Sequence, residues 1–295
     1  MVSRWLNRER LAALMWATGW TLATRLPESA VSWLGHSAAD LVHRRNGPGV
    51  RRLKANLAQV TTVGPELLEP VTRAAVRSYA RYWTEALRLS GWSRKRIRDS
   101  FAPEGLHHLT DALAAGRGVV LVLPHTANWD LAGAWVATHL RVPFTTVAER
   151  LKPDFLFNRF IAHRTSLGME VLPHDCPSTF PTLLRRLRQA GLVILLADRD
   201  LSSSGVEVEF FGSPARMPTG PAVLAQRTGA LLLPVMLWYD DGPVMRGRVF
   251  PPLETSGHSP GQAVRKVTQA MADHFAAGIA QHPQDWHMLQ RLWTH

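Results

Sequence analysis

The spacing of hydrophobic residues divides the chain into two parts that meet near Phe101. Before Phe101, apolar residues recur every three or four positions, as they do on the buried face of an amphipathic helix. Pro27 and the turn-forming run Asn46-Gly47-Pro48 interrupt this pattern. We therefore predict helices over residues 8–25, 28–44, 49–60 and 66–89.

After Phe101, short runs rich in Val, Leu and Phe alternate with stretches of helical spacing. The expected strands cover residues 118–123, 144–149, 169–172, 192–197, 206–211, 230–239 and 246–250. The expected helices between and after them cover residues 129–139, 153–167, 179–190, 221–228 and 260–281. Strands that are joined by helical crossovers form a mostly parallel sheet with helices on both faces. The last two strands are close enough along the chain to pair antiparallel.

This pattern predicts an α/β fold with a mostly parallel central sheet, preceded by an N-terminal helical layer. No repeat, low-complexity linker or clear boundary separates the two parts. We therefore expect a single domain over residues 1–295, in which residues 1–100 form the helical layer and residues 101–295 form the α/β core.

The composition narrows the class of protein. Hydrophobic residues make up 46% of the chain, enough for a large core, which excludes intrinsic disorder. The single cysteine, Cys176, excludes an intrachain disulfide and fits a reducing cytosol. The formal net charge of +11 favours a polyanionic partner, such as nucleic acid, an anionic membrane surface or a phosphorylated cofactor.

The N-terminal helices carry signals for membrane contact. Four tryptophans, a residue that favours the boundary between lipid and water, lie within the first 33 residues. The uncharged run from Leu11 to Thr24 has 14 residues, whereas a membrane-spanning helix needs about 20. We expect these helices to lie on a membrane surface rather than to cross it.

A histidine and a carboxylate follow the first predicted strand of the second part, in the run His125-Thr-Ala-Asn-Trp-Asp130. His125 lies at the carboxyl end of that strand, where open α/β sheets bind ligands. Asn128 can cap a helix that carries Asp130 in its first turn. A neutral imidazole can accept a proton from an alcohol, and a carboxylate on its other nitrogen would fix the tautomer and stabilise the imidazolium. The same spacing also suits a purely structural pair, in which His125 caps the strand and Asp130 caps the helix.

Sequence blocks that lie in order along the chain resemble one family. They cover residues 78–83, 125–130, 144–153, 164–172, 197–201, 205–212, 216–222 and 285–290. The His-x4-Asp block is the signature of the glycerolipid acyltransferase superfamily. The chain as a whole resembles its bacterial lipid A biosynthesis branch, and within that branch the phosphatidylinositol mannoside acyltransferases.

The resemblance implies an acyl-CoA-dependent O-acyltransferase. Such enzymes move a long acyl chain, typically palmitoyl, from acyl-CoA to a mannose 6-hydroxyl of a phosphatidylinositol mannoside with one or two mannoses. The implied location is the cytoplasmic face of the bacterial plasma membrane, in contact with anionic lipid. Acyl-CoA is then a co-substrate, and no cofactor, metal ion or nucleic acid is required. We expect the protein to be a monomer.

The resemblance also implies roles for individual residues. His125 would be the general base and Asp130 its orienting partner, while Glu149 and Arg164 would hold the acceptor or the donor. Asp198 would also belong to the catalytic group, at a position where related sequences can carry glutamate.

Two further motifs supply candidate binding groups. Arg199, which follows a predicted strand, is a candidate substrate-binding residue. Asp198 and Asp200 flank it, so one of the two carboxylates can support His125 or Arg164 while the other caps the next turn. Gly220 lies where backbone amides at a helix start can bind an anion.

Other functions remain open at this stage. The same chemistry on a lipid A precursor or a lysophospholipid would need the same residues. An acyl-CoA thioesterase would use the same pair to activate water instead of an alcohol. A basic nucleic-acid-binding protein is favoured by the charge alone.

Overall fold

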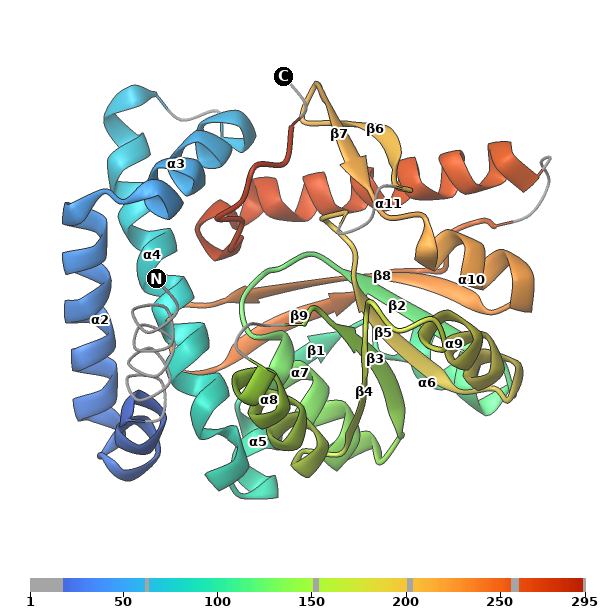
Figure 1. Cartoon of the computed structure of the whole chain (residues 1–295), viewed down its shortest axis with the longest axis horizontal. Helices are drawn as coiled ribbons and strands as arrows, with labels where there is room; N and C mark the ends of the chain where they lie inside the picture. The colour runs from blue at the N-terminus through green and yellow to red at the C-terminus, as the bar shows by residue number, and fades with distance from the viewer. Residues whose placement is uncertain (1–17, 62–63, 151–153, 201–203, 256–259, 294–295) are drawn as a thin grey trace, which may run out of the picture.

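The computed structural model describes residues 18–61, 64–150, 154–200, 204–255 and 260–293 (Figure 1). Residues 8–17 of the first predicted helix lie outside these ranges, and residues 18–25 are helical as predicted.

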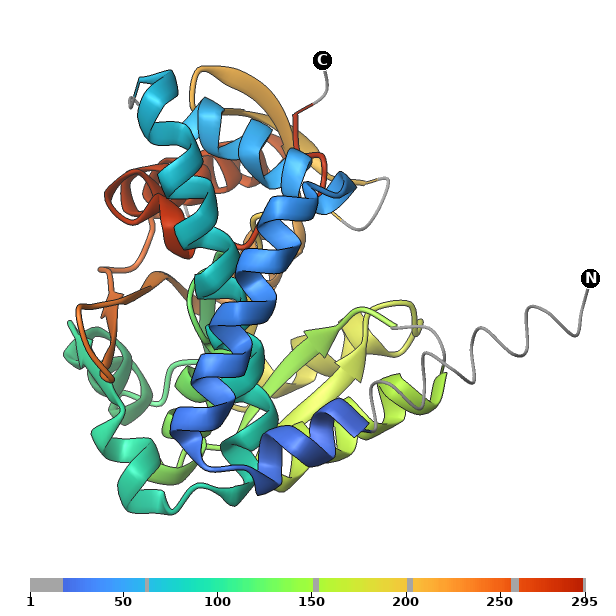
Figure 2. The same ribbon diagram turned by 90° about the vertical axis from the view of Figure 1, so that its left-hand side faces the viewer.

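The N-terminal layer consists of helices that pack against one another at one end of the sheet (Figures 1 and 2). Three of them confirm the predicted helices, namely α2 (Glu28–Arg45), α3 (Pro48–Val60) and α4 (Pro65–Arg88). The helix α2 stops at Asn46, which has a left-handed φ of 45°, and proline begins both α3 and α4.

A cluster of basic residues, Arg94-Lys95-Arg96 with Arg98, follows this layer and forms a short helix that the hydrophobic pattern does not predict. This helix, α5 (Arg94–Asp99), begins where the Ser93 hydroxyl accepts a hydrogen bond from the backbone N–H of Arg96 at 3.1 Å. Only Ile97 is buried among its six residues, so it has no apolar stripe to reveal it in the sequence.

A seven-stranded sheet forms the centre of the molecule, in the order β1-β9-β8-β2-β5-β3-β4. Its strands are β1 (Phe101–Glu104), β2 (Val119–Leu123), β3 (Phe144–Ala148), β4 (Met169–Pro173), β5 (Leu192–Leu196), β8 (Leu231–Tyr239) and β9 (Met245–Val249). Neighbouring strands pair in parallel except β8 and β9, which are antiparallel. The predicted fold class and the antiparallel pair at the end of the chain are therefore confirmed.

One predicted strand lies outside this sheet. Residues 206–211 were expected to belong to the parallel sheet, but β6 (Val206–Phe210) pairs with β7 (Ser213–Met217) in a separate antiparallel hairpin. Phe211 and Gly212, the two loop residues, have φ of 53° and 71°, which is the conformation of a tight hairpin turn. The hairpin was not predicted because Ser213–Met217 contains a proline and only one large apolar residue, Met217.

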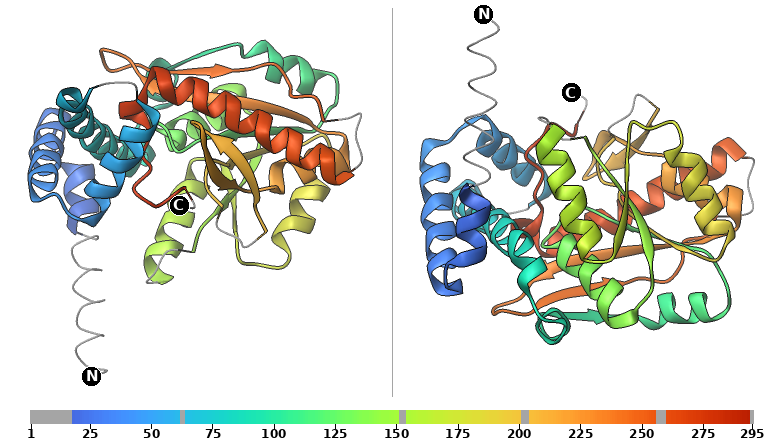
Figure 3. Two further views of the ribbon diagram at one scale, coloured as in Figure 1. Left: turned by 90° about the horizontal axis from the view of Figure 1, so that it is seen from above. Right: turned by 60° about the horizontal axis from the view of Figure 1, so that its bottom comes forward.

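Helices cover both faces of the sheet, as predicted (Figure 3). They are α6 (His107–Ala114), which was not predicted, α7 (Trp129–Trp135), α8 (Asp154–Ser166), α9 (Thr179–Arg188), α10 (Gly220–Thr228) and α11 (Pro260–Gln281). Alternate residues of β2 point into two separate cores. Val120 and Val122 pack with α9, α10 and α11, whereas Leu121 and Leu123 pack with α6 and α7.

The pairing of β2 with β5 prepares the functional site. In this parallel pair Leu123 lies opposite Leu196. His125 lies two positions after Leu123, and Asp198 lies two positions after Leu196. The register therefore delivers these two residues side by side at the carboxyl edge of the sheet.

Candidate functional site

His125 and Asp198 are joined by two hydrogen-bonding contacts. The Nδ1 atom of His125 lies 2.6 Å from one carboxylate oxygen of Asp198, and the backbone N–H of His125 donates to the other oxygen at 2.9 Å. The indole N–H of Trp286 donates to that second oxygen, also at 2.9 Å. Asp198 is fully buried, so these donors replace the water that a carboxylate otherwise needs.

These contacts determine the state of both groups. Burial alone would raise the pKa of Asp198, but the charge of His125 and the hydrogen bonds from His125 and Trp286 outweigh it and lower the pKa. An ionised Asp198 only accepts hydrogen bonds, so Nδ1 of His125 carries a proton. In the neutral imidazole, Nε2 is then left with its lone pair, ready to accept a proton.

Asp130 is not the carboxylate that contacts His125, and this part of the prediction is wrong. Asp130 forms a two-pronged ion pair with Arg164, at 2.7 Å to Nε and 3.1 Å to Nη2. The Tyr82 hydroxyl donates to Asp130 at 2.9 Å. Asp130 lies on the first turn of α7, where Asn128 caps the helix as predicted, and this turn points the carboxylate toward α8 rather than toward His125.

The ion pair between Asp130 and Arg164 is a buried structural support beside His125. Burial alone would raise the pKa of Asp130, but the charge of Arg164 and its hydrogen bonds lower the pKa below the usual value. The Asp130 charge in turn raises the pKa of Arg164, against the effect of burial. Both carboxylate oxygens and two guanidinium nitrogens are engaged in this pair.

Glu149 and Arg199 form a second ion pair at the same edge of the sheet. Glu149 follows β3, and one of its carboxylate oxygens accepts a hydrogen bond from Nη2 of Arg199, which follows β5. The neighbouring Arg150 instead pairs with Asp175. The Nε atom of Arg199 is buried without a hydrogen-bond partner among the residues that the structure describes. Arg199 therefore holds an unused donor close to the site.

Asp200 and Gly220 lie farther from His125. The Asp200 carboxylate accepts a hydrogen bond from the backbone N–H of Gly205 at 3.0 Å, so Asp198, and not Asp200, is the carboxylate beside His125. Gly220 begins α10 and lines a second hollow of about 600 Å³. Arg199 and Leu196 line both this second hollow and the one that contains His125.

A buried group that sequence reasoning missed lies behind His125. The Ser78 hydroxyl lies 2.7 Å from an Asp285 carboxylate oxygen and 3.0 Å from Nε2 of His287. Since a hydroxyl has one proton, Ser78 donates it to Asp285 and accepts a hydrogen bond from Nε2–H of His287. The backbone N–H of His287 also donates to the carbonyl of His125, at 2.8 Å.

Burial gives this group unusual pKa values. It raises the pKa of Asp285 to about 6. It also lowers the pKa of His287 to about 3, assisted by the charge of His125. His287 is therefore neutral, and its Nδ1 is an acceptor that has no partner within the described residues. Residues 78–83 and 285–290 were among the family-like blocks, but no spacing in the sequence indicates that they meet.

These side chains surround a hollow of about 270 Å³, which we call the catalytic hollow. Its wall includes His125, Glu149, Arg164, Arg199 and His287, together with the aromatic side chains Tyr79, Tyr82, Trp83 and Trp129. The ring of Trp129 meets that of His125 edge-on, with centroids 5.3 Å apart. The hollow thus combines a proton acceptor, hydrogen-bonding groups and an aromatic surface, which suits a sugar hydroxyl as the reacting group.

The described helices include none that is both long and apolar enough to cross a bilayer.

Comparison with known proteins agrees with the sequence motifs. A family model described as bacterial lipid A biosynthesis acyltransferase matches residues 5–295. The chain is 46% identical over 285 residues to the phosphatidylinositol mannoside acyltransferase of Mycolicibacterium smegmatis, with 95% of this chain and 90% of the relative covered. It is also 46% identical over 284 residues to the protein of the same name from Mycobacterium tuberculosis, with 94% of this chain and 87% of the relative covered.

Proposed function

Because this chain belongs to the bacterial lipid A biosynthesis acyltransferase family and is an acyltransferase, we propose that it acylates a phosphatidylinositol mannoside with acyl-CoA as the donor. The similarity to two relatives that are named phosphatidylinositol mannoside acyltransferase supports this choice of acceptor. The His125–Asp198 pair at the catalytic hollow is the observation that carries the chemistry.

The reaction begins with removal of a proton from the acceptor. A mannose hydroxyl, the 6-hydroxyl by family resemblance, gives its proton to Nε2 of His125 as its oxygen attacks the thioester carbonyl. Asp198 stabilises the imidazolium that forms. The tetrahedral oxyanion collapses, the carbon–sulfur bond breaks, and CoA leaves as a thiolate that takes up the proton. The product ester stays on the glycolipid.

Arg199 is the group best placed to stabilise the oxyanion. Arg164 already donates twice to Asp130, whereas Nε of Arg199 is a buried donor without a partner among the described residues. Arg199 also lines the catalytic hollow, and a donor that is fixed before the reaction lowers the barrier because little reorganisation is needed as charge develops.

The donor occupies two spaces that adjoin the catalytic hollow. The second hollow, with His174, Arg227 and the first amides of α10 at Gly220, suits the phosphates of CoA. A buried apolar cavity of about 50 Å³ lies on the other side of Trp129, between α7 and the sheet. The acyl chain enters there, and because the cavity is small, the surrounding side chains must move apart to admit it.

The N-terminal layer places the enzyme on its membrane. Trp33, Leu34, Leu41 and Val42 of α2 are all exposed, with Trp33 at 68%. Large apolar side chains gathered on one helix are unfavourable in water and suit insertion into the lipid headgroup region. The positive net charge favours anionic lipid, as at the cytoplasmic face of the plasma membrane.

The test is release of CoA thiol from palmitoyl-CoA, with and without purified phosphatidylinositol mannoside. We compare the wild type, His125→Ala, and the control His107→Ala, whose exposed imidazole lies on α6. Release that requires the acceptor and disappears only in His125→Ala is the expected result. Release without stimulation would indicate a thioesterase. Stimulation by a lipid A precursor or a lysophospholipid instead would assign the other acceptor.

A further inference from the structure

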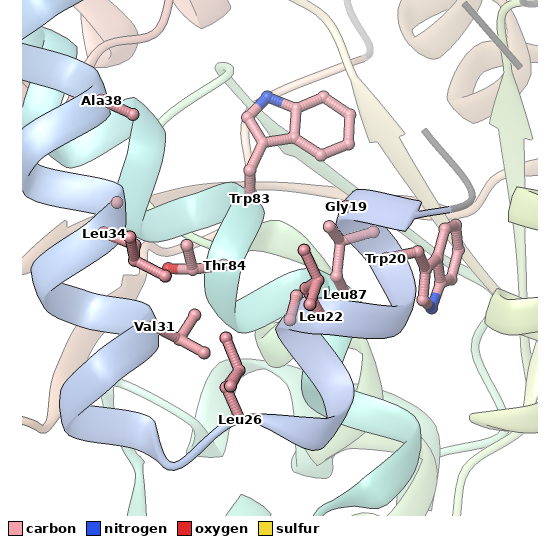
Figure 4. A pocket seen from close by; sticks show the side chains of 12 residues that line it. Gly19, Trp20, Leu22, Leu26, Val31, Leu34, Ala38, Trp83, Thr84 and Leu87 are labelled. Atoms are coloured by element: carbon pink, nitrogen blue, oxygen red, sulfur yellow. The ribbon is translucent and has the colours of Figure 1, made fainter. Parts of the chain in front are cut away.

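An apolar groove lies in the N-terminal layer, between residues 18–26, α2 and α4 (Figure 4). We call it the helical groove. Its volume is about 490 Å³. Leu22 and Leu26 extend into it from the first segment, Val31 and Leu34 from α2, and Leu87 from α4. Thr84 is the one polar side chain among the lining residues that the structure describes.

Small residues keep the helical groove open. Gly19, Gly35 and Ala38 line it, where larger side chains would fill it. A Cβ atom at Gly19 would meet no other atom within 4 Å, so space is available there. A Cβ atom at Gly35 would come within 3.1 Å of Thr84 Cγ2, so the helices α2 and α4 are close together at that point.

Trp83 connects the helical groove to the catalytic hollow. Its side chain belongs to the lining of both spaces. The indole ring is held by aromatic neighbours, with its centroid 5.1 Å from that of Tyr82 and 5.6 Å from that of Phe160. One molecule with a polar part and an apolar part can therefore place them on the two sides of Trp83.

We propose that the helical groove binds one hydrocarbon chain of the acceptor glycerolipid while the headgroup of that lipid occupies the catalytic hollow. This inference rests on the proposed function. The acceptor is favoured over the donor because the helical groove opens to the surface. Leu22 and Leu34 are half exposed, at 50% and 46%. Farther along α2, Leu41 and Val42 are also exposed. A lipid whose second chain stays in the bilayer needs such an open side, whereas the donor chain has the less open apolar cavity that Trp129 lines between α7 and the sheet.

The proposal predicts how filling the helical groove changes the kinetics. Gly19→Leu adds a large side chain at a lining position of the helical groove where a Cβ atom meets nothing within 4 Å, and it improves the helix propensity of that position. The chain makes the same contacts before and during the reaction, so its loss should raise KM and leave kcat unchanged. We expect a KM for diacylated phosphatidylinositol mannoside that is about tenfold higher. With a deacylated acceptor, glycerophosphoinositol mannoside, KM should change less than twofold.

The matched control is Gly261→Leu. This glycine is also helical and exposed, and an added Cβ would likewise meet nothing within 4 Å, but it lies on α11. It should behave as the wild type with both acceptors. An equal rise in KM for both acceptors in Gly19→Leu, or no rise for either, would overturn the proposal. A changed preference for the chain length of the acyl-CoA would assign the helical groove to the donor instead.

A second measurement does not depend on turnover. Phosphatidylinositol mannoside with a photoreactive diazirine in one acyl chain is irradiated with the wild type and with Gly19→Leu, and labelled peptides are identified by mass spectrometry. We expect labelling within residues 18–45 that Gly19→Leu abolishes and that unlabelled phosphatidylinositol mannoside suppresses more strongly than phosphatidylglycerol. Equal suppression by both lipids would indicate bulk lipid, and absence of labelling there would exclude a chain site. If this labelling occurs but the wild type has no transferase activity, the proposed function would be overturned while the lipid-chain site in the helical groove would stand.

Discussion

His125 and Asp198 are two residues beyond opposite positions of a parallel strand pair, and they contact each other through both the ring and the backbone of the histidine. The backbone contact matters as much as the ring contact. It holds one carboxylate oxygen at the end of β2, so the other oxygen is left to face Nδ1. The sheet register thereby sets the orientation of the imidazole and the position of its proton.

Replacing Asp198 should therefore abolish most of the activity while the fold is retained. In Asp198→Asn, the amide oxygen must still accept from the backbone N–H of His125 and from Trp286, so the amide NH₂ faces Nδ1. That reverses the tautomer and places the proton on Nε2, where it blocks proton transfer. We expect kcat to fall by about 10²- to 10⁴-fold, measured by acyl transfer. Asp240→Asn, in an exposed ion pair, is the control. A fall of less than tenfold in Asp198→Asn would count against the pair.

Loss of Asp130 should destabilise the protein, because Arg164 would remain buried without its counter-ion. Asp130→Asn should lower the free energy of unfolding by about 3 kcal/mol, measured by urea denaturation. Tyr82→Phe removes one hydrogen bond to the same carboxylate and should cost about 1 kcal/mol. Similar values for the two variants would mean that the ion pair contributes little.

His287 and Asp285 should give the folding stability opposite dependences on pH. Because burial lowers the pKa of His287 from 6.5 to about 3, its contribution is complete above pH 6.5 and is lost as the pH falls toward 3. Because burial raises the pKa of Asp285 from 3.8 to about 6, its contribution is complete below pH 3.8 and is lost as the pH rises through 6. Between pH 7 and pH 5 the two effects partly cancel in the wild type.

Single variants should separate these effects. When the pH is lowered from 7 to 5, His287→Gln should lose about 2 kcal/mol less unfolding free energy than the wild type, and Asp285→Asn about 1 kcal/mol more. Urea denaturation at both pH values measures the differences. If the unfolding free energy changes by the same amount in all three proteins, the pKa of neither group differs between the folded and unfolded states.

Polar substitutions on α2 should weaken membrane binding without affecting the fold. Trp33→Ser combined with Leu41→Ser removes two exposed apolar side chains, and exposed positions of this kind change stability by about 0.5 kcal/mol or less. We expect a severalfold loss of sedimentation with anionic vesicles. Leu67→Ser, at an equally exposed leucine of α4, is the control. Sedimentation that is the same in all these proteins would exclude α2 as the contact.

The sequence by itself determined the order of helices and strands, the mostly parallel sheet and the identity of the family. These features depend on local spacing, which repeats within each element, and on motifs that are continuous in the chain. Asn128 is an example, since its capping role requires only the three residues that follow it. The elements that escaped prediction, such as β1 and β7, are short and lack that spacing.

The tertiary structure alone decided which carboxylate contacts His125. Asp130 is near in sequence, but the first turn of α7 carries it away to Arg164. Asp198 is 73 positions away, and the pairing of β2 with β5 brings it back. The contact of Ser78 with Asp285 and His287 likewise joins residues that are 207 and 209 positions apart. The first contact depends on strand register and the second on the packing of α4 against the C-terminal segment, so no local pattern of residues encodes them.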